Sequence, residues 1–312
     1  MPTNDSILFP PQASTYAADV DALYYFIHYV AIFFWVLIVA TIFYFLWRYR
    51  RGHKEGVGPT HSLPLELTWS IIPLILVIAM FFWGFRGFMV LSRAPGDAEE
   101  IHVTAKKWLW NFEYPNGQQA IGELHVEVNK PYKLIMTSED VIHSFYVPSF
   151  RNKMDVLPGR ITTFWFEATM TGEHQVFCTE YCGDGHSDML AKVVVHTPED
   201  YQRWLEESQV EDTTTPLPEL GERIFAGKGV CHTCHSTDGS TKVGPTFKGL
   251  FGRQEQLADG STVTVDEEYI RESILQPGAK VVQGFAPTMP TYQGQLTDRE
   301  VAGLIEYIKT LQ

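Results

Sequence analysis

Cysteine is scarce in this chain: only four of its 312 residues are cysteines. They form two close pairs, Cys178 with Cys182 and Cys231 with Cys234. The spacing within each pair is better explained by a bound cofactor than by a framework of disulfides. The scarcity therefore argues against a small fold held together by disulfide bonds.

Positive charge is also scarce. The chain has 24 Lys and Arg against 37 Asp and Glu, which gives a net charge of −13 at pH 7. Residues 1–86 contain five residues of each sign, so the acidic excess lies entirely in residues 87–312. Such a surface suits a basic protein partner and argues against a nucleic acid partner. Residues 1–21 contain no Lys or Arg, and because a secretory signal begins with a basic region, no signal peptide is expected.

Two long runs lack charged residues altogether. Residues 22–47 are apolar or aromatic except for His28, Thr41 and several tyrosines, and residues 67–85 form a second run. The first run is long enough to cross a bilayer as a helix. One such run also occurs in buried core helices, but two runs that flank a basic loop favour a transmembrane hairpin. The spans are predicted at about 22–47 and 67–91.

The loop after the first run is basic and contains Arg48, Arg50, Arg51 and Lys54. Loops rich in Lys and Arg stay in the cytoplasm, so this loop is expected on the inside. Arg86 follows the second run, where its side chain extends to the membrane interface. The N-terminal segment and everything after about residue 91 are then expected on the external side of the membrane.

Beyond residue 100 the apolar pattern changes to period two, which is typical of strands. Short runs with Gly and Pro between them carry the alternating residues Ile101, Val103, Ala105, Leu124, Val126, Val128, Tyr132, Leu134, Met136, Phe164 and Phe166, followed by the apolar run 193–195. Short strands separated by turns predict an all-β sandwich or barrel.

The densest group of metal-binding side chains is Cys178, Cys182, His186 and Met189. Soft sulfur ligands beside an imidazole select copper, or less often zinc or iron. Three residues between the cysteines allow both thiolates to point at one centre, and the backbone carbonyl of Glu180 can face the same centre. A Cys178–Cys182 disulfide is the simpler alternative, but it leaves the nearby imidazole and thioether without a purpose.

A further ligand has to come from elsewhere in the chain. His143 lies in an apolar, strand-like run that ends at Pro148, where a loop begins. A lone histidine in such a run is usually a core residue. Beside the cysteine loop it becomes the best candidate for the remaining ligand.

These residues resemble a known family. The run from His143 to Phe145 and the pattern C-x-E-x-C-G-x-x-H-x-x-M are similar to the binuclear copper site of cytochrome c oxidase subunit II. The resemblance implies two copper ions bridged by both thiolates, in a cupredoxin-like Greek-key domain. The implied ligands are the side chains of His143, Cys178, Cys182, His186 and Met189 and the backbone carbonyl of Glu180. Such a site has no open coordination position, so it transfers single electrons and does not bind substrate.

The same resemblance assigns roles outside the copper ligands. The Glu180 side chain is expected to reach a Mg2+ shared with subunit I, as suits an anionic oxygen and a hard cation. Glu66 stands before Trp69 and Pro73 and is expected at the entrance of a proton path, although an acid at a helix start often only complements the helix dipole. Trp108 matches the surface tryptophan where electrons enter, but Leu109 replaces the family's usual tyrosine.

The C-terminal part carries Cys231-His-Thr-Cys234-His235, the attachment pattern of c-type haem. Two thioethers fix the haem in this pattern, and the histidine binds the iron. No histidine follows His235, and Met289 is the only later methionine, so it is the expected second axial ligand. His/Met ligation raises the reduction potential and leaves no open position, which again indicates electron transfer.

The surrounding residues resemble class I cytochrome c. The pattern Gly221-x-x-x-Phe225 is similar to its first helix, and residues 244–253 are similar to the loop after the haem motif, in which the Pro245 carbonyl orients the proximal histidine. A closing helix is predicted to begin at Thr297, with Glu300 completing a capping box.

The whole chain thus resembles subunit II of a bacterial caa-type cytochrome c oxidase. The expected fold is a multidomain membrane protein, with a two-helix transmembrane hairpin, a cupredoxin-like all-β Greek-key domain and an all-α class I cytochrome c domain. The predicted boundaries are an external N-terminal segment at 1–21, the hairpin at 22–94, the copper domain at 95–200, an acidic and Pro-rich linker at 201–219 and the cytochrome c domain at 220–312.

The implied function is to receive electrons for a proton-pumping respiratory oxidase, through covalent haem c and then the copper pair to a haem of subunit I, where oxygen is reduced. This chain would belong to the enzyme without containing its catalytic centre. Its expected partners are subunits I and III and an external donor, namely cytochrome c, another small redox protein or a quinol-oxidising complex. Its expected place is the bacterial plasma membrane, with the copper and haem domains on the periplasmic side.

Three other functions fit parts of the sequence. A membrane-tethered haem and copper carrier that serves another terminal reductase needs both metal sites but not Glu66. A copper-delivery module needs an exchangeable site, and a fused haem has no purpose there. A quinol-oxidising relative dispenses with the copper ligands, all of which are present here.

Overall fold

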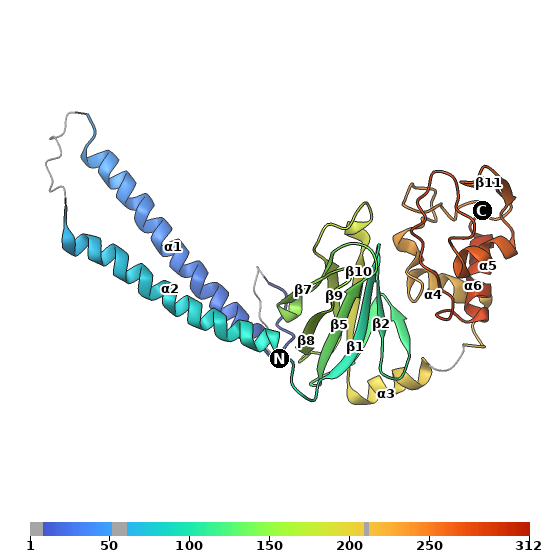
Figure 1. Cartoon of the computed structure of the whole chain (residues 1–312), viewed down its shortest axis with the longest axis horizontal. Helices are drawn as coiled ribbons and strands as arrows, with labels where there is room; N and C mark the ends of the chain where they lie inside the picture. The colour runs from blue at the N-terminus through green and yellow to red at the C-terminus, as the bar shows by residue number, and fades with distance from the viewer. Residues whose placement is uncertain (1–8, 52–60, 209–211) are drawn as a thin grey trace. The chain divides into compact units, whose positions relative to one another are not determined.

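The computed structural model describes residues 9–51, 61–208 and 212–312. Part of the predicted N-terminal segment, Lys54 of the basic loop and Glu211 of the predicted linker lie outside the described residues. The chain divides into two compact units, Thr15–Arg93 and the remainder, which are described separately (Figure 1).

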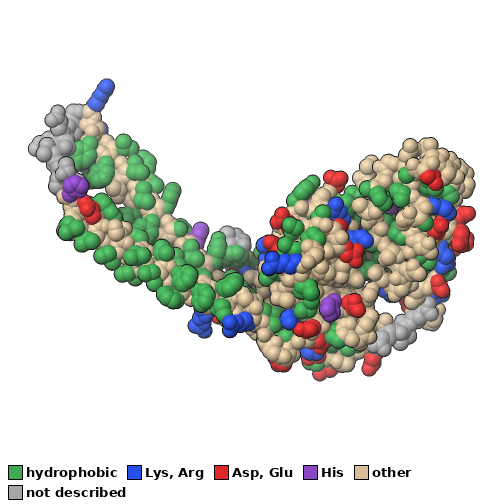
Figure 2. Space-filling model, in the orientation of Figure 1, with side chains coloured by type: hydrophobic (Ala, Val, Ile, Leu, Met, Phe, Trp, Pro, Cys, Tyr) green, Lys and Arg blue, Asp and Glu red, His purple; other side chains and the backbone are tan. Residues whose placement is uncertain are grey.

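The first unit is a pair of long apolar helices, α1 (Ala17–Arg48) and α2 (Leu63–Ser92). Their most apolar stretches have mean hydropathies of 2.5 and 2.2, and none of the residues in those stretches is buried. Hydrophobic side chains cover the visible face of both helices (Figure 2). A helix of this length exceeds the roughly 30 Å of a bilayer's hydrocarbon core. The prediction of two membrane-spanning helices fits this unit.

The second unit begins with an all-β sandwich of two five-stranded sheets, counted over the described residues. The first sheet has the order β3-β2-β1-β5-β8 and the second has β4-β10-β9-β6-β7. The pairs β1/β5 and β4/β10 are parallel, and the other paired strands are antiparallel. The strands are β1 (Glu99–Lys106), β2 (Leu109–Glu113), β3 (Gln119–Ile121), β4 (Glu123–Glu127), β5 (Pro131–Ser138), β6 (His143–Val147), β7 (Asn152–Val156), β8 (Thr162–Glu167), β9 (Gly172–Cys178) and β10 (Leu190–His196).

The core of the sandwich consists of the inward-facing side chains of both sheets. The alternating residues found in the sequence are buried in it, except for the half-buried Val128, and the largest fully buried side chains include Trp110, Phe112, Phe145, Phe164 and Phe166. Phe145 of β6 lies opposite Cys178 of β9 in the antiparallel register. The sheet therefore brings the start of β6 next to the end of β9, although 35 residues separate His143 from Cys178 along the chain.

The segment before α1 belongs to the same unit as the sandwich. The Ala13 amide donates to Ser149 O over 2.9 Å, and Thr169 N donates to Ala13 O over 3.0 Å. The side chain of Ser14 donates to Phe150 O. These bonds attach residues 13–14 to the sandwich.

A short helix occupies the first part of the predicted linker. Helix α3 (Pro198–Glu207) begins after Thr197, whose hydroxyl accepts a hydrogen bond from Asp200 N. The linker prediction rested on acidic and Pro-rich composition. The N-cap threonine, the proline directly after it and the acidic first turn are the sequence signals of this helix start.

The C-terminal domain is mainly helical. It contains α4 (Leu217–Ala226), α5 (Glu267–Leu275) and α6 (Asp298–Thr310), a 3₁₀ turn η3 (Cys231–Thr233) and a small hairpin, β11 (Gln254–Gln256) with β12 (Thr262–Thr264). Helix α6 begins after Thr297 with the predicted capping box to Glu300. These elements and the sandwich confirm the predicted fold class.

The first and last helices of this domain cross at two glycines. A Cβ placed on Gly221 would lie 2.0 Å from the carbonyl oxygen of Gly303 and 2.7 Å from Cβ of Tyr307. The Gly303 carbonyl oxygen is part of the helix backbone, so it cannot move aside for a methyl group as the end of a flexible side chain could. We expect Gly221→Ala to lower the domain's unfolding free energy by about 3 kcal/mol, as overpacking of a core does. Thermal unfolding followed by the visible haem spectrum measures this loss.

Gly278→Ala is the matched control, because a Cβ there meets nothing within 4 Å. Equal unfolding temperatures for the two variants would show that the α4/α6 crossing tolerates a methyl group.

Candidate functional site

The predicted copper ligands lie on two neighbouring strands and on the loop that joins β9 to β10. His143 is the first residue of β6, and Cys178 is the last residue of β9. Cys182 lies in the loop, His186 opens the 3₁₀ turn η2 (His186–Asp188), and Met189 is buried just before β10. The strand register fixes the first two residues, and the loop folds the others back toward them.

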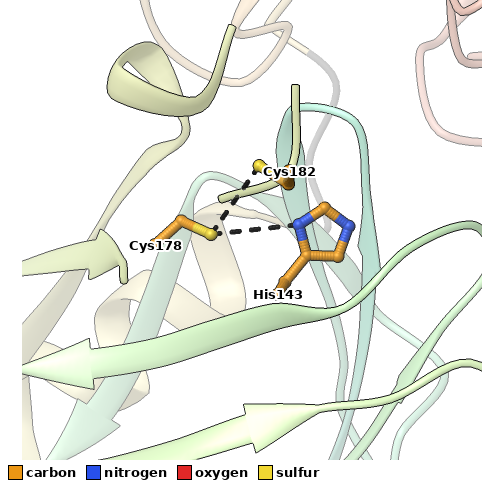
Figure 3. A group of neighbouring side chains, drawn as sticks. All are labelled: His143, Cys178 and Cys182. Atoms are coloured by element: carbon orange, nitrogen blue, oxygen red, sulfur yellow. Dashed lines mark hydrogen bonds between the residues drawn. The ribbon is translucent and has the colours of Figure 1, made fainter. Parts of the chain in front are cut away.

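Each predicted donor atom lies within 3.9 Å of at least one other. Cys178 Sγ lies 3.9 Å from Cys182 Sγ and 3.9 Å from His143 Nδ1 (Figure 3). The Cys178 thiol also lies 3.3 Å from the Glu180 carbonyl oxygen. Cys182 Sγ lies 3.4 Å from His186 Nδ1 and 3.8 Å from Met189 Sδ. All four cysteines are free thiols, so the alternative of a Cys178–Cys182 disulfide is not realised in the structure.

The electrostatics of the cluster favour a thiolate. Hydrogen bonding from Cys182, and then from His143, lowers the pKa of Cys178 to about 3. The same contact with Cys178 raises the pKa of Cys182 well above its ordinary value. One proton is thus shared between two sulfur atoms, and a bound cation would displace it. Two thiolates, two imidazole nitrogens and a thioether are the donor types that select copper, so the residues fit such a centre.

Asp140 contacts the cluster through the predicted ligand His143. It was not among the residues predicted from the sequence. Its carboxylate lies 2.8 Å from His143 Nε2 and accepts the Lys107 amide over 2.8 Å. Burial raises its pKa, but the hydrogen bonds from His143 and from two backbone amides outweigh burial, so the pKa of Asp140 is below its ordinary value. A carboxylate at Nε2 keeps the proton on that nitrogen and leaves the Nδ1 lone pair toward the thiols. The signal in the sequence was an acid three residues before a predicted ligand.

We expect Asp140→Asn to weaken copper binding about 10- to 100-fold, the usual effect of removing an outer-shell partner of a ligating histidine. A titration of the copper-free protein against a competing copper chelator measures the affinity. Glu139→Gln is the matched control, since its carboxylate pairs with Lys106 and not with a predicted ligand. If both variants bind copper as tightly as the parent chain, Asp140 only stabilises the turn that contains it.

The predicted haem-binding residues line one apolar pocket of the C-terminal domain. Cys231, Cys234, His235, Pro245 and Met289 all contribute to its wall. The rest of the wall is mainly apolar and includes Phe247, Leu250, Ile274, Tyr292, Leu304 and Ile308. An apolar pocket with two thiols and two candidate axial ligands fits covalent haem c.

The proximal histidine is held in a defined orientation. His235 Nδ1 donates to the carbonyl oxygen of Pro245 over 2.7 Å, which leaves Nε2 free for a metal. Burial lowers the pKa of His235, so the neutral, ligating form is favoured. The ring stacks on Phe247 with a centroid distance of 4.5 Å, and a Cβ on Gly244 would lie 2.6 Å from its Cε1. Burial also raises the pKa of the Cys231 and Cys234 thiols, to about 12 and about 11.

Trp108 lies against the cysteine loop. Its side chain is only 6% exposed, whereas the sequence resemblance puts this tryptophan at the surface. The indole is covered because it packs on Gly183 and Gly185 and lines the same pocket as Cys231 and Met289. Leu109, the departure from the family's usual tyrosine, also lines that pocket.

Glu66 lies in the first turn of α2, in the two-helix unit Thr15–Arg93. Its carboxylate accepts a hydrogen bond from Ser62 N over 3.1 Å and lies 3.6 Å from His61 Nδ1. It therefore satisfies the backbone N–H of Ser62 at the start of the helix. The side chain is 40% exposed, so it is also open to a partner.

Three family models match the chain. "Cytochrome C oxidase subunit II, transmembrane domain" matches residues 2–86, and the periplasmic domain of the same subunit matches residues 121–197. "Cytochrome c" matches residues 218–312.

Curated relatives match over most of their length. Cytochrome c oxidase subunit 2 of Thermostichus vulcanus is 30% identical over an alignment of 279 residues, which covers 72% of this chain and 85% of the relative. Cytochrome c oxidase subunit 2 of Alkalihalophilus pseudofirmus is 30% identical over 290 residues, covering 89% of this chain and 82% of the relative. A solved structure, the periplasmic domain of subunit II of cytochrome oxidase of Bradyrhizobium japonicum, is 30% identical and covers 38% of this chain and 97% of its own, with a TM-score of 0.36.

Proposed function

Because this chain belongs to the cytochrome c oxidase subunit II family and ends in a cytochrome c domain, we propose that electrons enter a proton-pumping respiratory oxidase through it. Membership makes it one subunit of an oxidoreductase complex, with a copper centre and haem c implied by its domains. The proposed route runs from an external donor to haem c, then to a binuclear copper centre and on to the haem of subunit I. Oxygen is reduced in subunit I and not in this chain.

One observation carries the proposal: the six predicted copper donors converge from β6, β9 and the following loop. Within that group His143, Cys178 and Cys182 are buried and have ligand atoms within 4.8 Å of one another. When bound, the copper pair and the haem supply one-electron transfer. The surrounding residues hold their ligand atoms in place, since His143 is fixed by Asp140 and His235 by Pro245. Fixed ligands suit electron transfer, because little has to move when the electron arrives.

Trp108 supports a route between the two centres. Its indole contacts the loop that carries Cys182 and His186, and it also lines the pocket that holds Cys231 and Met289. An aromatic ring that packs on the copper loop and also lines the haem pocket is well placed to mediate electron transfer between the two centres. We propose this role for Trp108 in place of an external entrance at the surface.

The remaining proposals concern the partners. The Glu180 side chain is exposed while its carbonyl faces Cys178, so the carboxylate is free to reach a Mg2+ shared with subunit I. Subunits I and III are the proposed membrane partners, and the donor is cytochrome c, another small redox protein or a quinol-oxidising complex. The acidic excess of residues 87–312 suits a basic donor. The proposed location is the bacterial plasma membrane, with both metal domains in the periplasm.

The test is the metal content of the purified full chain after maturation with haem and loading with copper. Copper and iron are measured per chain, and the electron paramagnetic resonance spectrum is recorded. We expect two coppers that share one unpaired electron, together with one low-spin haem. Iron without copper, with Cys178 and Cys182 oxidised to a disulfide after loading, would refute the proposal.

Glu66→Gln separates the proton path from helix capping. Glutamine still accepts the Ser62 amide, so the start of α2 is preserved, but it cannot ionise. We expect oxygen consumption by the assembled oxidase to fall several-fold while reduction of haem c by its donor keeps its rate. Oxygen uptake and stopped-flow haem absorbance measure the two quantities. Unchanged turnover would leave Glu66 as a helix cap and favour the tethered-carrier alternative.

A further inference from the structure

The copper loop contains two glycines that lie directly against Trp108. A Cβ on Gly183 would lie 3.2 Å from Cζ2 of the indole. A Cβ on Gly185 would lie 2.5, 2.8 and 2.9 Å from Cδ2, Cε3 and Cγ of the same ring. Side-chain atoms essentially never approach this closely, so the indole occupies the space that a side chain at residue 185 would need.

The two glycines are needed for different reasons. Gly183 has a φ of +116°, a conformation that favours glycine whatever surrounds it. Gly185 has a φ of −86° and a ψ of 14°, which residues with side chains also adopt. Backbone conformation therefore does not require glycine at residue 185. The contact with the indole does require it, because the three nearest atoms all belong to one rigid aromatic ring.

This contact connects the tryptophan to the metal ligands. Gly185 immediately precedes His186, and Gly183 immediately follows Cys182. Cys182 Sγ and His186 Nδ1 lie 3.4 Å apart, so the indole rests on the backbone that carries two neighbouring donor atoms. Asp140 accepts the Lys107 amide and so fixes the residue before Trp108.

We propose that Gly185 is a positioning residue for electron transfer, because its missing side chain lets Trp108 pack directly on the copper loop. The inference rests on the proposed role of Trp108 between the two metal centres. The rate of electron transfer from haem c to the copper centre then depends on Gly185, which is neither a metal ligand nor a redox group. Any side chain at residue 185 moves the indole away from the loop and leaves the ligands in place.

Gly185→Ala in the full chain tests the proposal, with Gly96→Ala as the control. A Cβ on Gly96 meets nothing within 4 Å, and its φ is not in the left-handed region. The first readout needs no copper: the chain is labelled with 5-fluorotryptophan, and the Trp108 resonance is identified by its absence in Trp108→Phe. We expect Gly185→Ala to shift this resonance and increase its solvent isotope effect, and Gly96→Ala to leave it unchanged.

The second readout is the rate of intramolecular electron transfer from reduced haem to oxidised copper in the assembled oxidase, after flash reduction. We expect Gly185→Ala to slow it several-fold, while copper content, the paramagnetic resonance spectrum and the copper reduction potential stay as in the parent. In a Trp108→Leu background Gly185→Ala should cause no further loss, since two changes on one contact are not additive.

The outcomes separate the two proposals. If Trp108→Leu transfers electrons at the parent rate, the role proposed for Trp108 fails, whatever Gly185→Ala does. If Trp108→Leu slows transfer but Gly185→Ala leaves the rate unchanged, the positioning role of Gly185 alone is refuted. An unshifted fluorine resonance in Gly185→Ala refutes it as well, even where the variant loads copper poorly.

Discussion

Replacing Cys182 by serine should abolish the binuclear copper centre. Both sulfur atoms are needed to bridge two ions, and a serine hydroxyl is a hard oxygen donor that soft copper disfavours. Cys182 also lies within 4 Å of three other predicted donors: Cys178 Sγ, His186 Nδ1 and Met189 Sδ. Its loss therefore removes the atom at the centre of the cluster.

The measured result should be a loss of the shared-electron paramagnetic resonance signal and of the second copper per chain. Oxygen consumption by the assembled oxidase should fall to background, while its donor still reduces haem c. Tyr181→Phe is a suitable control. Tyr181 is next to Cys182 but 73% exposed, and the substitution removes only its hydroxyl and keeps the aromatic ring. A serine variant with the parent's copper content and spectrum would show that the cysteines do not bridge a metal pair.

Replacing Met289 by leucine should have an equally large effect on the haem. Met289 lines the pocket together with His235, and leucine offers similar volume without a sulfur donor. A methionine ligand raises the reduction potential of a haem, so its loss should lower the midpoint potential and open a coordination position on the iron. We expect the variant's haem c to bind carbon monoxide in the reduced state and the parent's haem c to exclude it.

Redox titration and carbon monoxide difference spectra measure these changes. Met170→Leu makes the same substitution at a partly exposed position in the copper domain and should alter neither. A Met289→Leu chain that keeps the parent's potential and excludes carbon monoxide would mean that another residue holds the sixth position.

The local patterns of the sequence were sufficient for much of the architecture. The two uncharged runs predicted helices α1 and α2, and the alternating residues predicted the core faces of the sandwich strands. Thr297 and Glu300 predicted the start of α6, where the capping box is formed. These features depend on interactions between residues a few positions apart, which the order of residues determines directly.

Other features depend on which distant segments meet. The sequence suggested His143 only because the cysteine loop required another ligand, and the register of β6 with β9 is what brings it to Cys178. Gly185 carried no pattern of its own, and Asp140 had only the weak signal of an acid three residues before a predicted ligand. Their importance appears only when the fold brings a carboxylate to His143 and an indole to the loop.

The sequence by itself thus determined the kinds of donor atoms, their local spacing and the number of membrane-spanning runs. Only the tertiary structure decided which side chains orient those donors, where Trp108 lies and that Gly221 and Gly303 meet at a helix crossing. The reason is physical: spacing along the chain constrains neighbours within one strand, turn or loop. Contacts between elements are set by sheet order and helix packing, which the whole chain determines together.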